Sequence, residues 1–126
     1  MIKKDILYLD RGGEHQQANI IGCLEWANKT YNHLAHYKKV KGSLKHTKYK
    51  AAIIANTQLI DFSPKNIEFI LETFSEKGLP FLVFLNGEEK SIRDKIKKYS
   101  GQVIDYDSCV AEGNHVLKIT KFIQKL

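Results

Sequence analysis

The chain has 126 residues, of which 43% are hydrophobic, and its formal net charge at pH 7 is +6. This length suits one domain, residues 1–126, that buries a hydrophobic core, and the composition excludes a disordered chain. No apolar run approaches the ~20 residues that cross a bilayer, and there is neither a signal peptide nor a disulfide framework. We therefore expect a reduced, cytoplasmic protein with no membrane partner.

Lysine supplies most of the positive charge. The chain contains 18 lysines but only two arginines, Arg11 and Arg93. A positive field favours nucleic acid or another anionic surface as a partner. Lysine is a mobile point charge, however, whereas arginine supplies the planar fork that clamps phosphate. Chemistry that needs several positioned arginines is therefore hard to assemble in this chain.

The first part of the chain predicts a strand, a helix and a basic segment. Residues 6–9 form a short apolar run that ends at Asp10 and is followed by two glycines, as expected of a strand and a turn. A helix is predicted next, because apolar residues recur at three- and four-residue spacing at Ile20, Leu24, Ala27, Tyr31 and Leu34. Residues 36–50 are basic, and a loop or one short strand or helix could lie there.

From residue 51 onward, strands and helices alternate. Apolar runs over 51–55 and 81–85 predict strands buried on both faces, and a last short strand is predicted over 103–106. Ser63-Pro64 begins a helix that Lys77-Gly78 ends. Two further helices are predicted over 88–100 and 116–126. This order predicts an α/β fold, a three-layer sandwich in which helices cover both faces of a mainly parallel sheet of four to five strands.

Polar residues follow several of the predicted strands. Parallel sheets bind ligands at the carboxyl ends of their strands, so this edge is one candidate for a nucleotide or phosphate site. Its residues would be Asp10, Arg11, Gly12, Gly13, Asn56 and Asp107. The two glycines equally fit a tight strand-to-helix turn, because the loop is not a GxGxxG motif. A phosphoacceptor of the response-regulator type requires an aspartate after the central strand, and Asn56 at that position disfavours this chemistry.

Histidine and cysteine predict neither a metal site nor a nucleophile. His33 and His36 lie three residues apart and could share a metal, but no third ligand lies at a suitable spacing. Cys23 lies among apolar residues and is expected to be a packed core thiol, whereas Cys109 follows a predicted strand. We expect no metal and no cofactor.

The basic segment is a candidate nucleic-acid contact. Tyrosines interleave with its lysines, and such a surface can meet the phosphate backbone weakly and in a salt-dependent way. The lysines concerned are Lys38, Lys39, Lys41, Lys45, Lys48 and Lys50. A solvated, flexible loop explains the same residues equally well.

Residues scattered along the chain also match a known pattern. A strand containing Tyr8 and ending in Asp10-Arg11-Gly12-Gly13 precedes Gln16-Gln17 and a helix. Residues 59–64 follow a buried strand, and Ile104-Asp105-Tyr106 precedes Gly113 and the last helix. This series resembles the catalytic domain of serine recombinases, the resolvase/invertase family. That family reads Tyr-x-Arg-x-Ser-Thr, Leu-x-Arg-Leu-Ser-Arg and Ile-Asp-Thr at the corresponding places.

The resemblance implies that the family's active site is lost. The nucleophilic serine falls on Gly12, or on Gly13 if the alignment slips by one, and an arginine falls on Asp10. Two more arginines fall on Asp61 and Pro64, and only Ser63 of that motif remains. Strand exchange needs a nucleophile and several cations around the phosphoryl group. The resemblance therefore implies an inactive domain, not an enzyme, with a vestigial pocket of Asp10, Gly12, Gly13, Asp61 and Ser63.

Binding is then the function that the resemblance implies. The partner would be DNA, a recombination or mobile-element protein, or a second copy of the chain. The alternative is a small flavodoxin-like nucleotide- or phosphate-binding domain or enzyme with its site at the strand carboxyl ends. A third interpretation is a domain that binds only protein, whose basic face merely confers solubility.

Overall fold

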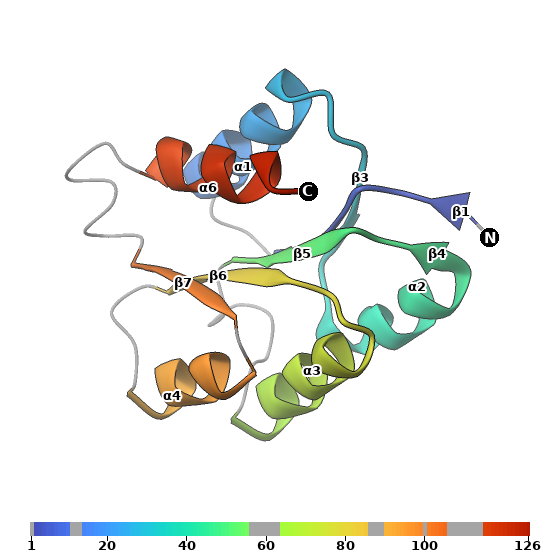
Figure 1. Ribbon diagram of the computed structural model, residues 1–126, viewed down its shortest axis with the longest axis vertical. Helices are drawn as coiled ribbons and strands as arrows, with labels where there is room; N and C mark the ends of the chain where they lie inside the picture. Colours follow the sequence, from blue (N-terminus) through green and yellow to red (C-terminus); the bar gives the residue numbers. More distant parts are fainter. Residues whose placement is uncertain (1, 11–13, 56–63, 86–89, 100, 106–114) are drawn as a thin grey trace.

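A five-stranded parallel sheet forms the centre of the computed structural model, which describes residues 2–10, 14–55, 64–85, 90–99, 101–105 and 115–126 (Figure 1). Its strands, in sheet order, are β3 (Tyr31–Leu34), β2 (Ile6–Leu9), β5 (Ala51–Ile54), β6 (Phe81–Leu85) and β7 (Gln102–Asp105). A small parallel sheet pairs β1 (Ile2–Lys3) with β4 (Thr47–Lys48). The parallel strands of the main sheet give it a carboxyl edge, where the strands end, and an amino edge, where they begin. The β1–β4 pair precedes β2 and β5 and therefore lies beside the amino edge (Figure 1).

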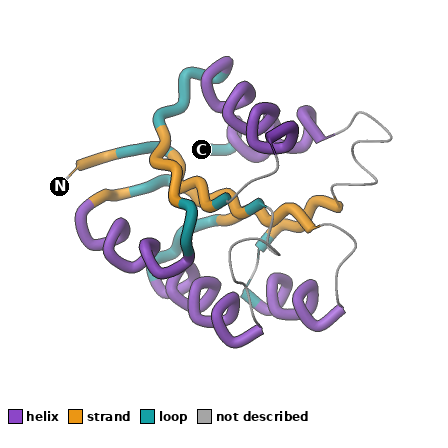
Figure 2. Tube along the Cα trace, turned by 180° about the vertical axis from the view of Figure 1, so that it is seen from behind, coloured by secondary structure: helices purple, strands orange, loops and turns teal. Residues whose placement is uncertain are grey.

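Helices cover both faces of the main sheet. One face carries α1 (Glu14–Trp26) and α6 (His115–Gln124), and the other carries α2 (Val40–His46), α3 (Pro64–Glu76) and α4 (Lys90–Lys98) (Figure 1). Seen from behind, the sheet is a single layer between these two groups of helices (Figure 2). The predicted α/β sandwich with helices on both faces is therefore confirmed.

The strands β2 and β5 connect the two halves of the core. Every residue of both strands is buried, and their alternate side chains enter two separate clusters. Leu7 and Leu9 pack among side chains of α2, α3 and α4, whereas Ile6 and Tyr8 pack among those of α1 and α6. Continuous apolar runs are typical of parallel strands that are covered on both faces. The same reasoning correctly predicted β5 and β6 as buried strands.

The predicted helix over residues 20–34 is wrong in its second half. The helix α1 ends at Trp26, Asn28 has a φ of 55°, and Tyr31–Leu34 forms the strand β3. The amide of Lys29 donates to the carbonyl of Leu24 at 2.9 Å, which closes the helix end. An edge strand needs no continuous apolar run, so β3 contains polar residues between Tyr31 and Leu34. The three-residue spacing of these two apolar residues therefore also fits a helix.

Two other predictions along the chain have clear outcomes. The helix α3 ends at Glu76, and Gly78 follows it as expected, with a φ of 63° that favours glycine. The amide of Leu79 donates to the carbonyl of Phe74 at 2.9 Å. The basic segment 36–50, left open by the sequence, contains a 3-10 turn η1 (Tyr37–Lys39), α2 and β4. It is thus largely ordered on the surface rather than a continuous loop.

A pair of glycine substitutions tests the packing of the sheet. A Cβ on Gly101 would lie 2.1 Å from Cε2 of the buried Phe81 ring, whereas a Cβ on Gly22 meets nothing within 4 Å. We expect Gly101→Ala to destabilise the fold by about 1–3 kcal/mol through overpacking. Gly22→Ala should stabilise it by roughly 0.5–1 kcal/mol, because glycine is a poor helix former. Urea unfolding of the two variants measures both changes, and equal effects would contradict the packing described here.

Candidate functional site

A buried acid lies at the carboxyl end of β2. Asp10 is fully buried and donates its amide to the carbonyl of Leu34 at 3.0 Å. The Tyr8 hydroxyl donates to Oδ2 of Asp10, and Nε2 of His33 donates to the carbonyl oxygen of Asp10 at 2.9 Å. The rings of Tyr8 and His33 stack with their centroids 4.9 Å apart, and Gln17 contacts Nδ1 of His33 at 3.2 Å. The polar groups at this strand end are therefore already engaged with one another.

Burial determines the protonation of Tyr8. Loss of solvent around the phenol raises its pKa far above the ordinary value of 10.0, and the hydrogen bond to Asp10 and the charge of Asp10 add to this rise. The phenol therefore stays protonated at neutral pH and serves as a permanent donor to Asp10. It cannot act as a base there.

Of the two sites predicted at the carboxyl edge, only Asp10 lies within the described residues. The structure brings the ends of β2 and β5 together, because the amide of Ala55 donates to the carbonyl of Leu9 at 2.9 Å. The remaining predicted residues lie outside the described part of the chain, namely Arg11, Gly12, Gly13, Asn56, Asp61, Ser63 and Asp107.

The six lysines of the predicted nucleic-acid contact are all exposed but do not form one group. Lys38 and Lys39 lie in η1, after the carboxyl end of β3. Lys41 and Lys45 lie on α2, and the ammonium group of Lys41 is 5.8 Å from the centroid of the Phe69 ring. The last two of the six, Lys48 and Lys50, lie at the amino edge, where they join a hollow that the sequence did not predict.

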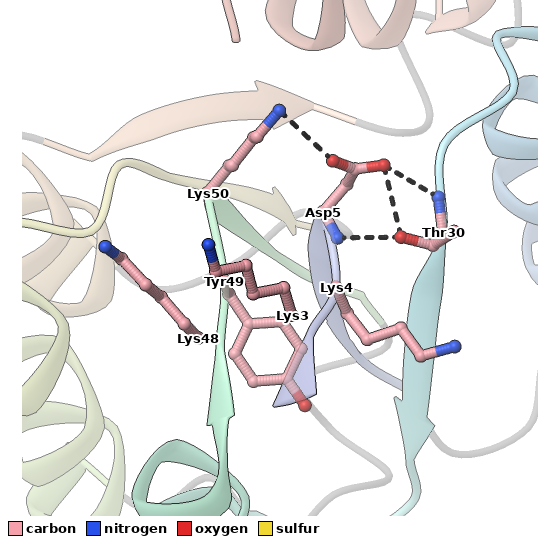
Figure 3. Close-up of a pocket in the computed structure, with 7 residues that line it drawn as sticks. All are labelled: Lys3, Lys4, Asp5, Thr30, Lys48, Tyr49 and Lys50. Atoms are coloured by element: carbon pink, nitrogen blue, oxygen red, sulfur yellow. Dashed lines mark hydrogen bonds and ion pairs between the residues drawn. The ribbon is translucent and has the colours of Figure 1, made fainter. Parts of the chain in front are cut away.

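This amino-edge hollow has a volume of about 350 Å³. It is lined by Lys3, Lys4, Asp5, Thr30, Lys48, Tyr49 and Lys50 (Figure 3). The pairing of β1 with β4 forms it, since Lys3 stands opposite Lys48 and the amide of Lys4 donates to the carbonyl of Lys48 at 3.0 Å. The amide of Lys50 in turn donates to the carbonyl of Asp5 at 2.9 Å.

Asp5 is the single acidic residue that lines this hollow, and Thr30 and Lys50 stabilise its ionised form. Oδ2 of Asp5 accepts the backbone amide of Thr30 at 2.9 Å and its hydroxyl at 3.2 Å, and Oδ1 lies 3.4 Å from the ammonium group of Lys50 (Figure 3). The hydrogen bond from the Thr30 amide is the main cause that lowers the pKa of Asp5 below 3.8, and Lys50 contributes to the same direction. Asp5 is thus ionised and links β2 to the start of β3.

A groove lies between α1 and α6 on the opposite part of the surface from α3 and α4 (Figure 1). Its volume is about 660 Å³, and its lining residues are uncharged: Ala18, Asn19, Gly22, Cys23, Trp26, Leu117 and Thr120. Trp26 is 81% exposed and Leu117 is 52% exposed, so two large apolar side chains of the lining are in contact with solvent. The groove therefore exposes apolar side chains to solvent.

The described residues contain no metal-binding cluster of three or more histidine, cysteine or acidic side chains. His33 lies on β3 rather than on a helix, and its ring is engaged with Asp10 and Gln17. Cys23 is half-buried at the edge of the core, and burial raises the pKa of its thiol. Within the described part of the chain, no helix is long and apolar enough to cross a membrane.

A parallel sheet between two helical layers, with polar groups at its carboxyl edge, defines a flavodoxin-like α/β domain. The chain is similar to the crystal structure of a two-component response regulator from Clostridium difficile, with a TM-score of 0.58, 14% sequence identity and coverage of 94% of this chain and 97% of that chain. It is also similar to a CheY-like response regulator receiver domain protein from Methanospirillum hungatei JF-1, with a TM-score of 0.62, 11% identity and the same two coverages, 94% and 97%. No protein-family model and no curated protein matches the chain. At these identities the likeness shows the fold, which is that of receiver domains.

The resemblance to serine recombinases is therefore wrong, and so is the role in DNA recombination or with mobile-element proteins that it implied. The described residues that carried it have structural roles. Tyr8 and the run 51–55 are buried in the core, and Gln17 contacts His33. Such buried runs recur in any parallel α/β fold because both faces of the sheet are covered.

Sequence reasoning missed Lys3, Lys4 and Trp26. The two lysines lie more than 40 positions from Lys48, and a pair of two-residue strands leaves no periodic signal. Trp26 carried a usable signal, because it lies off the apolar stripe that Ile20 and Leu24 form on the same helix.

The Tyr8–Asp10 hydrogen bond predicts a loss of stability in Tyr8→Phe. This change removes one donor to a fully buried carboxylate while keeping the ring in the core. We expect the free energy of unfolding to fall by about 1–3 kcal/mol, as measured by urea denaturation. Tyr31→Phe, on the partly buried neighbouring strand, is the matched control and should change it by less than about 0.5 kcal/mol. Equal losses would contradict a special role for the Tyr8 hydroxyl.

Asp5 predicts a defined pH dependence. Because its pKa is lowered in the folded protein, ionised Asp5 stabilises the fold at pH values above the ordinary carboxyl value of 3.8, and this contribution disappears as the pH falls below it. Asp5→Asn should therefore be less stable than the wild type at pH 7. The difference in urea midpoint between the two proteins should shrink at pH 3, and a difference that is independent of pH would contradict the assignment.

Proposed function

We propose that this protein is a receiver-fold binding module that docks a partner protein in the groove between α1 and α6. In this proposal the chain acts through contact and not through catalysis. The observation that carries the proposal is the large exposed indole of Trp26 beside Leu117, at the rim of an uncharged groove.

The energetics of apolar exposure favour a docking surface there. A tryptophan side chain buries about 150–250 Å² when it is covered, and tryptophan is among the residues that contribute most to protein interfaces. The small side chains Ala18 and Gly22 form the outer surface of α1 beside Trp26 and both are exposed. These small residues let the backbone of a partner approach α1 closely, while Trp26 and Leu117 contact the side chains of that partner.

The charge around the groove defines the partner's chemistry. None of the seven lining residues is charged. Of the two helices, α6 carries Lys118 and Lys121, α1 carries Glu14 and Glu25, and the whole chain carries +6. A groove between two helices suits an amphipathic helix, which places its apolar stripe in the groove and its polar face outward. Complementarity with the net positive charge of the whole chain favours an acidic helix over a basic one.

The residue type after the central strand supports binding as the mode of action. Asn56 lies two positions after the last residue of β5 in the sequence, and its amide is no nucleophile toward a phosphoryl group. The two similar solved structures are named as response regulators, which supports a place for this chain among signalling proteins. The chain would then receive or transmit a signal through its partner and not through an aspartyl phosphate on this strand.

Trp26 is the single tryptophan of the chain and is therefore a direct reporter of docking. An acidic amphipathic helical peptide should shift its fluorescence to shorter wavelength in a saturable way, because the indole passes from water into an apolar contact. A peptide with the same apolar positions and lysine in place of glutamate should bind more weakly. Leu117→Ala should weaken binding of the acidic peptide by about tenfold or more.

The control is Phe69→Ala, which removes an exposed aromatic side chain from α3 on the opposite face and should leave peptide binding unchanged. Equal binding of both peptides, or no effect of Leu117→Ala, would contradict docking in this groove. A phosphoryl donor with Mg²⁺ should leave the mass of the protein unchanged. Stable phosphorylation of a carboxylate would contradict the non-catalytic part of the proposal.

A further inference from the structure

The amino-edge hollow holds more positive charge than the structure compensates. Four lysines and one aspartate line it, which leaves an excess of three positive charges. Asp5 is bound by Thr30 and by Lys50. Among the described residues, Lys3, Lys4 and Lys48 form no ion pair. The hollow therefore presents unneutralised ammonium groups to whatever enters it.

The strand pairing places the backbones of two of these lysines side by side. Lys3 and Lys48 are direct partners in the parallel register of β1 and β4. Positive side chains that project from neighbouring positions repel each other. An anion placed between the two ammonium groups would attract both and offset their mutual repulsion. The pairing thus creates a position that is more favourable with an anion than without one.

The backbone around the hollow is held in place before any ligand arrives. Tyr49, which lies between Lys48 and Lys50, is only 7% exposed. Its hydroxyl accepts a hydrogen bond from Nδ2 of Asn32 at 2.9 Å and lies 2.5 Å from Oγ of Ser43. The two flanking lysines therefore project from a fixed segment, so that a ligand needs to order only their side chains.

The side chains are arranged to receive an anion on one side of the β1–β4 pair. Figure 3 shows Lys50 directed to Asp5, Lys3 and Lys48 extended toward one side of the hollow, and Lys4 extended away from them. Lys3 and Lys48 are therefore the principal ligands, and Lys50 is able to share its charge between Asp5 and an anion. Lysine binds phosphate as a point charge, without the bidentate geometry of arginine.

We propose that the amino-edge hollow binds a compact phosphate-bearing ligand through Lys3, Lys48 and Lys50. A volume of about 350 Å³ is within the range of small-ligand pockets. It is too small to admit a nucleic-acid duplex, which could meet only its rim. The volume of the hollow and the three lysines Lys3, Lys48 and Lys50 favour a ligand with two adjacent phosphates over a single one. This site lies at the opposite edge of the sheet from the buried Asp10.

The test is calorimetric titration of the protein with inorganic pyrophosphate at constant ionic strength. We expect saturable binding of one pyrophosphate per chain. The double variant Lys3→Gln/Lys48→Gln should raise the Kd by about tenfold or more, because it removes the two principal charges. Lys38→Gln/Lys39→Gln is the matched control, since it removes the same charge from exposed lysines of η1, and it should change the Kd by less than about twofold.

Three outcomes would overturn the proposal. The first is the absence of saturable binding by the wild type. The second is an equal loss of affinity in both double variants, which would mean that net charge alone attracts the anion. The third is binding of a short DNA duplex under conditions where pyrophosphate does not bind, which would favour backbone contact along the whole basic surface. Thermal unfolding without ligand shows whether each variant is folded. If the Lys3→Gln/Lys48→Gln variant is destabilised, the single variant Lys3→Gln takes its place in the titration.

Discussion

The pairing of β2 with β5 is the constraint on which the rest of the structure depends. Both strands are buried on both faces, so the register from Ile6↔Ala51 to Leu9↔Ile54 decides which side chains meet each helical layer. A slip by one residue would exchange the two sets and move Tyr8 into the wrong layer. The same register brings Asp5 beside Lys50 at one edge. At the other edge it places the amide of Ala55, the residue after β5, against the carbonyl of Leu9.

The two edges of the sheet have different chemistry as a result. At the carboxyl edge, the carboxyl group of the buried Asp10 accepts a hydrogen bond from Tyr8, and its backbone carbonyl accepts one from His33, so these groups link the ends of β2 and β3. At the amino edge, charges are brought together without full compensation, since Lys3 stands opposite Lys48. A lysine-rich composition suggested only a general attraction for anions. In the folded chain these lysines lie in separate places: some are exposed on η1 and α2, and others line the amino-edge hollow.

Local patterns predicted the centre of the fold better than its periphery. The strands β2, β5 and β6 were evident because strands covered on both faces need unbroken apolar runs. The edge strand β3 has one strand neighbour, and its Tyr31 and Leu34 also fit a helical period, so the pattern was ambiguous. Of the candidate site residues, Asp10 was predicted from its place after a strand. Lys3 was not, because only the pairing of distant two-residue strands reveals its neighbours.

The failed resemblance to recombinases shows where functional information lies in such a chain. The matches that the structure describes, such as Tyr8 and the run 51–55, are core positions that covered parallel sheets share. The chemistry of a family depends instead on polar residues after the strands, and those did not match. The same holds for phosphoacceptor chemistry, which requires an aspartate after the central strand, where this sequence has Asn56. The two sites proposed above are the groove between α1 and α6 and the amino-edge hollow. Both lie away from the carboxyl edge, where parallel α/β sheets ordinarily bind ligands.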